Sequence, residues 1–234
     1  KGGMAVLNED GFNRSIHNLE SDYFRSKFEP ELSKFRGNSG VGIISDMEAS
    51  PIIANSHLGR FAVVMVGRVN NLDVLERRAL KKKQHFAELS QRGVNPTELV
   101  SVLICEAKSF KEGIQNVQDR IKGSCSLLIL ANEGIYAARD KYGRTPIVIG
   151  KKKESFAVAS ETTSFFNLGY MIDYYLGPGE IIKITAEGYE QIKPPEQKIQ
   201  ICAFLWVYYG YPASSYEGIN VDTCRYRCGN ALAA

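Results

Sequence analysis

The order of strand-like and helix-like segments places the strongest constraint on the fold of this chain. Short β-branched runs come first, at residues 41–45, 52–55 and 61–66. Helical patterns follow at 70–80, 95–103 and 110–121. Hairpins then take over, with strands expected at 126–130 and 135–139, 147–150 and 156–160, and 180–184 and 189–192. This order favours packed layers over alternating βαβ units, so the sequence predicts an α+β fold.

Capping residues mark two of the helical segments. Asn71 is expected to cap the helix over residues 70–80. Asn95 is a suitable N-cap for the next helix, with Pro96 at the first helical position and Glu98 at the capping-box position.

Three short motifs in the hairpin region combine turn residues with a carboxylate. They are RDKYGRTPI at residues 139–147, VASE at 158–161 and GPGE at 177–180. Asp140 lies close to the turn residue Gly143, and a carboxylate there is expected to cap backbone N–H groups. The first motif is therefore assigned a structural rather than a catalytic role.

The C-terminal part begins with a linker over residues 194–198. The aromatic run at 202–209 is expected to form a strand packed against a following domain, and residues 221–233 a helix. The chain starts at Lys1 without an initiator Met, which indicates a piece of a longer polypeptide.

Charge and cysteine content argue against several classes of function. The 29 basic and 26 acidic residues are well mixed, so no basic groove for nucleic acid is indicated. Five cysteines without a CxxC pair do not suit a secreted disulfide framework and favour a reducing cytoplasm. No apolar run reaches the roughly 20 residues of a membrane span. The sequence predicts a cytoplasmic protein that binds neither nucleic acid nor membranes.

Residues 125–233 resemble one known family in the order of their motifs. The matching pieces are IYAARD at 135–140, GRTP at 143–146, ASE at 159–161, GPGEI at 177–181 and CAFLWVYY at 202–209. They are similar to the glutaminase domain of the amidophosphoribosyltransferases, glycosyltransferases of purine biosynthesis that carry a class II glutamine amidotransferase domain.

The resemblance implies a fold and a division into domains. The fold is the N-terminal-nucleophile (Ntn) hydrolase architecture, a four-layer αββα sandwich. Residues 1–193 are expected to form the amidotransferase-like domain, without its N-terminal segment. Residues 194–234 are expected to be a C-terminal extension that contains the linker, the aromatic strand and the start of a phosphoribosyltransferase domain missing from this chain.

The resemblance also implies a reaction in which an N-terminal cysteine hydrolyses glutamine and the ammonia passes to phosphoribosyl pyrophosphate. This chain starts with Lys1 and so carries no such nucleophile, although a missing N-terminal segment could restore the cysteine. Phosphoribosyl pyrophosphate and Mg²⁺ would bind only through the missing domain, and no cofactor is expected within the chain itself. The family further implies a homo-oligomer and, in some relatives, an iron–sulfur cluster, for which Cys202 is the candidate ligand.

Three positions of the family's glutamine site match residues that differ here. Ser45 stands where the family has an arginine that holds the substrate carboxylate. Val66 and Gly67 match the family's Asn-Gly oxyanion pair, which leaves the backbone N–H of Gly67 as a donor. Pro96 replaces the aspartate that binds the substrate's amino group. The changes predict an impaired or altered glutamine site.

Two functional hypotheses follow. In the first, the chain is part of an enzyme whose pocket is impaired, or rebuilt for glutamine or a related amide by residues such as Arg68, Asn70 and Asn71. In the second, the chain is a non-enzymatic scaffold or regulatory module that keeps the fold without glutaminase chemistry.

The remaining histidines and cysteines give weaker signals. The three histidines, at positions 17, 57 and 85, lack metal-ligand spacing. Cys224 and Cys228 lie four residues apart on the predicted C-terminal helix, a spacing compatible with a metal or iron–sulfur site. Buried apolar cysteines are the expected alternative.

Overall fold

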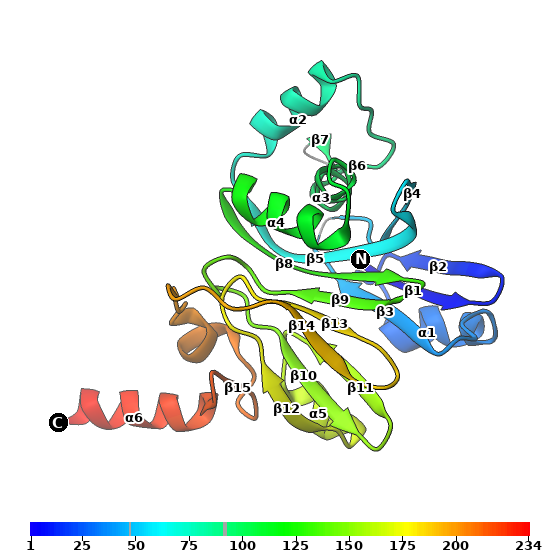
Figure 1. The fold of residues 1–234 in the computed structure, drawn as a ribbon. Helices are drawn as coiled ribbons and strands as arrows, with labels where there is room; N and C mark the ends of the chain where they lie inside the picture. Colours follow the sequence, from blue (N-terminus) through cyan, green and yellow to red (C-terminus); the bar gives the residue numbers. More distant parts are fainter. Residues whose placement is uncertain (47, 91–92) are drawn as a thin grey trace. The chain divides into compact units, whose positions relative to one another are not determined.

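The computed structural model describes residues 1–46, 48–90 and 93–234, and the chain divides into two compact units, Lys1–Tyr136 and Ala137–Ala234 (Figure 1). Strand β9 (Gly134–Ala138) contains the point of division. Both units are built on antiparallel strand pairs, as the hairpin pattern predicts.

The first unit begins with a three-stranded sheet in the order β2-β1-β3. Its strands are β1 (Gly2–Asn8), β2 (Gly11–His17) and β3 (Ser39–Ile44). Gly11 allows the tight turn between β1 and β2 because its φ is 118°. α1 (Phe24–Phe28) and the 3-10 helix η1 (Glu29–Lys34) cover the outer face of this sheet. There Phe28 packs edge-on against His17.

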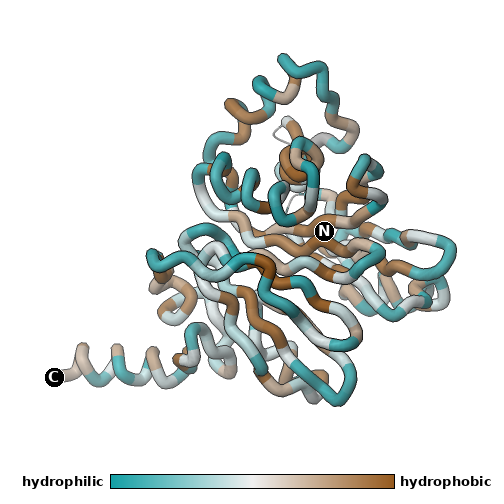
Figure 2. The backbone as a smooth tube through the Cα atoms, viewed as in Figure 1, coloured by the Kyte–Doolittle hydropathy of each residue, from teal (hydrophilic) through white to brown (hydrophobic). Residues whose placement is uncertain are grey.

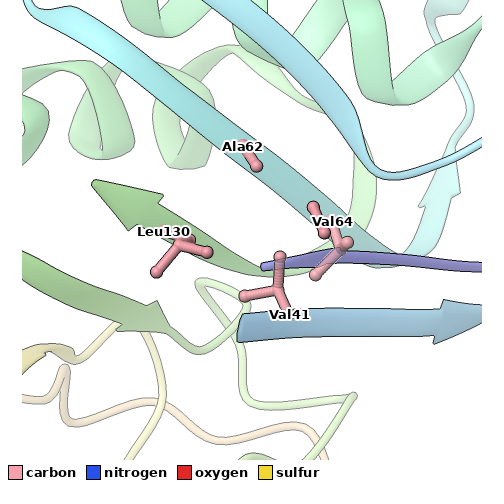
Figure 3. Packing of buried hydrophobic residues seen from close by; sticks show 5 residues of the cluster. Val41, Ala62, Val64 and Leu130 are labelled. Carbon is pink, nitrogen blue, oxygen red and sulfur yellow. The ribbon is translucent and has the colours of Figure 1, made fainter. Parts of the chain in front are cut away.

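A second sheet of the same unit packs against the first. Its strands are, in order, β4 (Ile52–Ser56), β5 (Gly59–Val69), β8 (Gly123–Ala131) and the start of β9. Side chains alternate between the two faces of a strand. Ala62 and Val64 of β5 therefore both face the first sheet, where they form a buried cluster with Val41, Leu130 and Ala5 (Figure 3).

Two helices cover the opposite face of β5. They are α3 (Pro96–Cys105) and α4 (Phe110–Arg120). Phe61 of β5 packs edge-on against Phe110, with ring centroids 5.2 Å apart. The most hydrophobic backbone of the unit runs along β5 and β8, between these helices and the first sheet (Figure 2). The first unit thus has four layers, helix, sheet, sheet and helix, and the predicted αββα architecture is confirmed.

The remaining elements of the first unit show how the predicted caps behave. α2 (Leu72–Lys81), β6 (Leu89–Ser90) and β7 (Gly93–Val94) lie between β5 and α3. Asn95 caps α3 as predicted, because its Oδ1 accepts a hydrogen bond from the Thr97 N–H at 2.9 Å. The predicted side-chain cap at Asn71 is wrong, since that amide bonds to the backbone at the last residue of α4 and just after it. The predicted capping box is also wrong, since the Glu98 carboxylate accepts two N–H groups of the loop before β6.

The second unit contains two further groups of strands. β10 (Val148–Lys152), β11 (Ser155–Ala159) and β12 (Met171–Tyr175) form a sheet in the order β11-β10-β12. β13 (Ile181–Ile184) pairs with β14 (Tyr189–Lys193). α5 (Thr163–Leu168) places Phe165 against Gly150, where a Cβ would lie 2.6 Å from the ring. The lysine-rich turn between β10 and β11 is present, with Lys153 in a left-handed conformation at a φ of 49°.

The aromatic segment of the second unit is helical, so the predicted strand at residues 202–209 is wrong. Its elements are η2 (Leu205–Tyr209), a short π-helix, then β15 (Ser215–Tyr216), β16 (Ile219–Asn220) and α6 (Val221–Ala233). Arg225 of α6 stabilises the helical turn by donating to its carbonyl groups, including that of Trp206 at 2.8 Å. Trp206 packs with Tyr216 in a small core. The predicted C-terminal helix is confirmed.

Candidate functional site

The two sheets of the first unit have a common end at which their inner faces become polar. A Cβ at Gly11, in the turn after β1, would lie 3.3 Å from Arg60 Nη1 at the start of β5. Gly11 and Arg60 thus mark the end of the sandwich at which β3 and β5 begin. Both strands therefore finish at the opposite end, and Figure 1 shows their last residues on the same side. We call this end the polar end and define it by the inner-face residues Ser45, Val66 and Arg68.

Ser45 extends β3 by one residue and uses its hydroxyl group locally. Its N–H donates to the Lys1 carbonyl at 2.9 Å. Ser45 Oγ donates to Glu48 Oε2 at 3.0 Å and accepts from the Glu48 N–H at 3.2 Å. The side chain at this position thus holds a carboxylate and presents no cation. Sequence reasoning did not identify Glu48, although its Ser-x-x-Glu spacing was an available signal.

Val66 and Gly67 lie in the last part of β5 and pair in register with β8. Val66 lies opposite Ser126, and its side chain is 41% exposed. Gly67 has a φ of 144°, and a Cβ there would lie 2.1 Å from the Ser124 carbonyl oxygen, so only glycine fits. The valine side chain offers no hydrogen-bond donor at the place that it occupies.

Pro96 is the first residue of α3, and the residue before it connects two parts of the polar end. Asn95 is fully buried, and its Nδ2 donates to the Ala49 carbonyl at 2.8 Å. The Asn95 N–H also donates to the Glu88 carbonyl at 3.2 Å. The structure therefore ties the segment that follows Ser45 to the start of the helix that carries Pro96. No sequence pattern indicated this tether.

The three residues considered for a rebuilt pocket have different surroundings. The Asn71 amide is used structurally, with Oδ1 accepting the Lys122 N–H at 2.8 Å. The Asn70 N–H donates to the Lys122 carbonyl at 2.7 Å. Arg68 follows Val66 by two residues, so both belong to the same face of β5, and both are exposed. Of the three, Arg68 and Asn70 retain exposed side chains available for a ligand, since only a backbone group of Asn70 is used.

We use the name motif cluster for four charged residues from the motifs of the second unit, of which Glu161 is half-buried and the others are buried: Arg139, Asp140, Glu161 and Glu180. The Arg139 guanidinium, 1% exposed, donates to the carbonyls of residues 143 and 176 and to a carboxylate near β15. Asp140 Oδ2 accepts the backbone N–H of residue 144 at 2.7 Å, which confirms the predicted capping role.

Glu161 links the motif cluster to the C-terminal segment. It accepts hydrogen bonds from Ser214 Oγ and, at 2.8 Å, from the Tyr216 hydroxyl group. Burial and the adjacent Glu161 carboxylate raise the pKa of Tyr216 well above its usual range. These contacts give the VASE motif a structural role, to hold the segment that leads into α6.

The cysteines and histidines do not form a metal centre within residues 1–46, 48–90 and 93–234, where no three His, Cys, Asp or Glu side chains converge. Cys202 is exposed just before η2. The predicted burial of Cys224 and Cys228 is wrong, since the first is half-buried and the second exposed. Partial desolvation and the neighbouring Cys228 raise the pKa of the Cys224 thiol. Across the same described ranges, no helix has the length and hydropathy needed to cross a membrane.

Comparison with known proteins identifies the family. A model of the glutamine amidotransferase domain matches residues 39–167, a range that includes the polar end and most of the motif cluster. The chain belongs to the glutamine amidotransferase domain family. The expected Ntn-hydrolase fold is confirmed by a solved allosteric regulatory enzyme of purine biosynthesis, which superposes with a TM-score of 0.87 at 25% identity over 99% of this chain and 51% of that one.

The individual relatives of this amidotransferase domain are amidophosphoribosyltransferases, as the motifs indicated. The mouse protein is 27% identical over 210 residues, covering 78% of this chain and 40% of that protein. The Bacillus subtilis protein is 27% identical over 246 residues, covering 99% of this chain and 50% of that protein. The structure of the Bacillus subtilis glutamine phosphoribosylpyrophosphate amidotransferase with ADP and GMP gives a TM-score of 0.85 at 26% identity. The chain thus spans about half the length of these relatives.

Proposed function

We propose that this amidotransferase domain serves an amidophosphoribosyltransferase-type protein and that its glutamine site hydrolyses glutamine far more slowly than the sites of ordinary family members. The observation that carries the proposal is Val66. It lies at the polar end, in the β5–β8 ladder, at the position where the family resemblance places a side-chain donor of the oxyanion hole. Loss of one such donor typically lowers the rate about a hundredfold to a thousandfold.

The other two substituted positions support the same proposal. Ser45 is neutral and already donates to Glu48, so it cannot supply the charge-assisted pair that an arginine gives a carboxylate. Pro96 has neither a carboxylate nor a backbone N–H with which to bind an amino group. Each change removes a separate contact to glutamine, so their effects are expected to add.

The whole protein is proposed to be cytoplasmic and to assemble as a homo-oligomer. Phosphoribosyl pyrophosphate and Mg²⁺ would bind to a part of the protein outside this chain, where ammonia is the nitrogen donor. If an iron–sulfur cluster is present, the exposed thiol of Cys202 is its candidate ligand here. The alternative function is a scaffold or regulatory module, which is favoured because the chain keeps the motif cluster while the glutamine-site positions are substituted.

Ammonia release from glutamine by the full-length protein, with and without phosphoribosyl pyrophosphate, tests the proposal. We expect turnover at least about a hundredfold below that of a relative with the intact Asn-Gly pair. Turnover equal to that of such a relative would overturn it. Synthesis of phosphoribosylamine from free ammonia would identify an enzyme part with a weak glutamine site, whereas its absence would favour the scaffold.

A further inference from the structure

The end of the second unit, residues 202–234, has a hydrophobic core of its own. We call this segment the strap; it contains η2, β15, β16 and α6. Its core consists of residues of these elements: Trp206, Tyr216 and Val221, with Leu205 and Cys224 packed against them. The elements of the strap pack chiefly on one another. The apolar contacts that stabilise the strap are therefore internal to it.

Polar contacts at consecutive residues join the strap to the start of α5. The Ser215 N–H donates to Thr162 Oγ1 at 2.8 Å, and the hydroxyl oxygens of Ser214 and Thr163 are 2.5 Å apart. Glu161 accepts from Ser214 Oγ and from the hydroxyl group of residue 216. When a segment moves away, such bonds are replaced by bonds to water, so each contributes modestly to closure. A segment with an internal core and a polar attachment can open without exposing that core.

Glu217 completes the attachment at the turn between β15 and β16. Glu217 and Gly218 have φ values of 51° and 74°, positive as both central residues of a type I′ turn require. Asparagine or glycine suits the first of these positions better than glutamate, whose Cβ is strained there. The Glu217 carboxylate pairs with the buried Arg139 guanidinium, and this contact explains why a glutamate occupies the position.

The chain has a point of rotation just before the strap. The Gln200 N–H donates to the Tyr142 carbonyl at 2.8 Å, which fixes the preceding segment to the second unit. The Cys202 carbonyl accepts the Leu205 N–H at 3.1 Å and so belongs to the helical turn of the strap. Ile201, between them, is 57% exposed and lies in no helix or strand. A change in the direction of the chain can therefore occur at Ile201.

Arg139 connects this attachment to the motif cluster. Its guanidinium also donates to the carbonyls of residues 143 and 176, so it holds two loops of the second unit as well as Glu217. We propose that the strap is a hinged element that swings away from the second unit as one body, with the Arg139–Glu217 pair as its clasp. The strap carries a set of exposed aromatic side chains: Phe204, Tyr208, Tyr209, Tyr211 and Tyr226. Opening moves this aromatic surface without unfolding the segment that bears it.

Lys153 provides a matched control for Glu217. It is also a non-glycine residue in a left-handed conformation in a turn of the second unit, with a φ of 49°. Asparagine tolerates this conformation better than lysine or glutamate, so the fold should accommodate both Glu217→Asn and Lys153→Asn. Both changes relieve the same kind of backbone strain, but only Glu217→Asn removes a partner of Arg139.

The test is hydrogen exchange of the full-length protein, measured at single amides. Exchange of a hydrogen-bonded amide proceeds through opening, so its rate reports the population of the open state. The Ser215 N–H belongs to the attachment, whereas the N–H groups of Gly210 and Val221 donate to carbonyls within the strap at 2.8 and 2.9 Å. We expect Glu217→Asn to accelerate exchange at Ser215 about tenfold to a hundredfold, the typical effect of losing a charged hydrogen bond. Exchange at Gly210 and Val221 should keep its wild-type rate.

Tyr216→Phe tests the other carboxylate of the attachment. The change keeps the ring in the core beside Trp206 but removes the donor to Glu161, so Ser215 should again exchange about tenfold faster. Lys153→Asn should leave all three amides unchanged.

Three results would overturn the proposal. Unchanged exchange at Ser215 in Glu217→Asn would show that the ion pair is not a clasp. Equal acceleration at Ser215 and Val221 would show that the strap unfolds instead of moving as one body. Equal acceleration in Lys153→Asn would assign the effect to turn strain and not to the loss of the pair with Arg139.

Discussion

The polar end of the first unit and the motif cluster of the second unit both contain an arginine and other polar side chains, but they differ in how deeply these side chains are buried. In the motif cluster, Arg139 and Asp140 are almost completely buried and hydrogen-bonded to backbone groups. At the polar end, Val66 and Arg68 are exposed, and Ser45 bonds to its own loop. The residues that match the family most closely are thus those on which the fold depends.

This difference in burial decides whether a sequence motif indicates the fold or the reaction. A buried charge without its partners strongly lowers the stability of the fold, so single substitutions in the motif cluster are expected to be destabilising. Exposed residues at the polar end carry little of the folding free energy, so they can change while the fold persists. Family membership therefore follows from the motif cluster, whereas the reaction must be argued from the polar end.

The largest effect is expected from Arg139→Met, which tests the structural side of this comparison. The change leaves the half-buried Glu217 carboxylate and two carbonyl groups without their donor. We expect the free energy of unfolding to fall by about 3–5 kcal/mol. Urea unfolding followed by circular dichroism measures it, with Arg144→Met, a less buried arginine, as the control. A loss below that of the control would break the comparison.

Val66→Asn tests the chemical side. The amide would supply the donor that valine lacks on the inner face of β5, so glutamine hydrolysis by the full-length protein should rise about a hundredfold. The Michaelis constant should change much less, since the contact forms in the transition state. Val74→Asn, at an exposed apolar residue of α2, is the matched control. No gain in rate would show that more than the oxyanion donor has been lost.

Asn95→Ala should have an intermediate effect, because Asn95 belongs to the polar end but is buried like the motif cluster. The change removes the cap of α3 and the tether to Ala49, so we expect a loss of about 2 kcal/mol in unfolding free energy. Asn95→Ser, which keeps a capping oxygen but not the tether, should recover roughly half of it. If serine recovers everything, the tether does not contribute.

The smallest effect is expected at Glu31, an ion-paired residue near the surface of the first unit. Hydrogen bonds from Ser15 and then His17 lower the pKa of Glu31 to about 2, from a usual value of 4.5. A lowered carboxyl pKa stabilises the fold above pH 4.5, and the contribution is lost as the pH falls toward 2. Unfolding free energies of Glu31→Gln should therefore depend less on pH in this window. Glu29→Gln removes one carboxylate from an exposed pair of the same unit and is the control for the loss of a negative charge.

Local patterns allowed much of the fold to be predicted. Strand positions, the Asn95 cap and the Asp140 turn depend on neighbours in sequence, so the sequence alone indicated them. The predictions of a side-chain cap at Asn71 and of a capping box at Glu98 were wrong, because backbone groups distant in sequence bind the same side chains. These long-range partners cannot be read from spacing.

The aromatic segment shows the other limit of sequence reasoning. Its aromatic and β-branched residues favour a strand, but Arg225 and the small core around Trp206 stabilise a helical turn instead. At the polar end, the substituted positions could be predicted from the resemblance alone. The Glu48 contact and the Asn95 tether became clear only from the three-dimensional arrangement.

Trp206 is the only tryptophan of the chain, and it lies buried in the second unit against Tyr216. Red-edge excitation would make fluorescence emission report on the second unit alone, while the first unit would remain spectroscopically silent. Emission and far-ultraviolet ellipticity recorded along the same denaturant series would reveal whether both units unfold in one cooperative transition. The native sequence thus already contains a site-specific optical probe that needs no labelling.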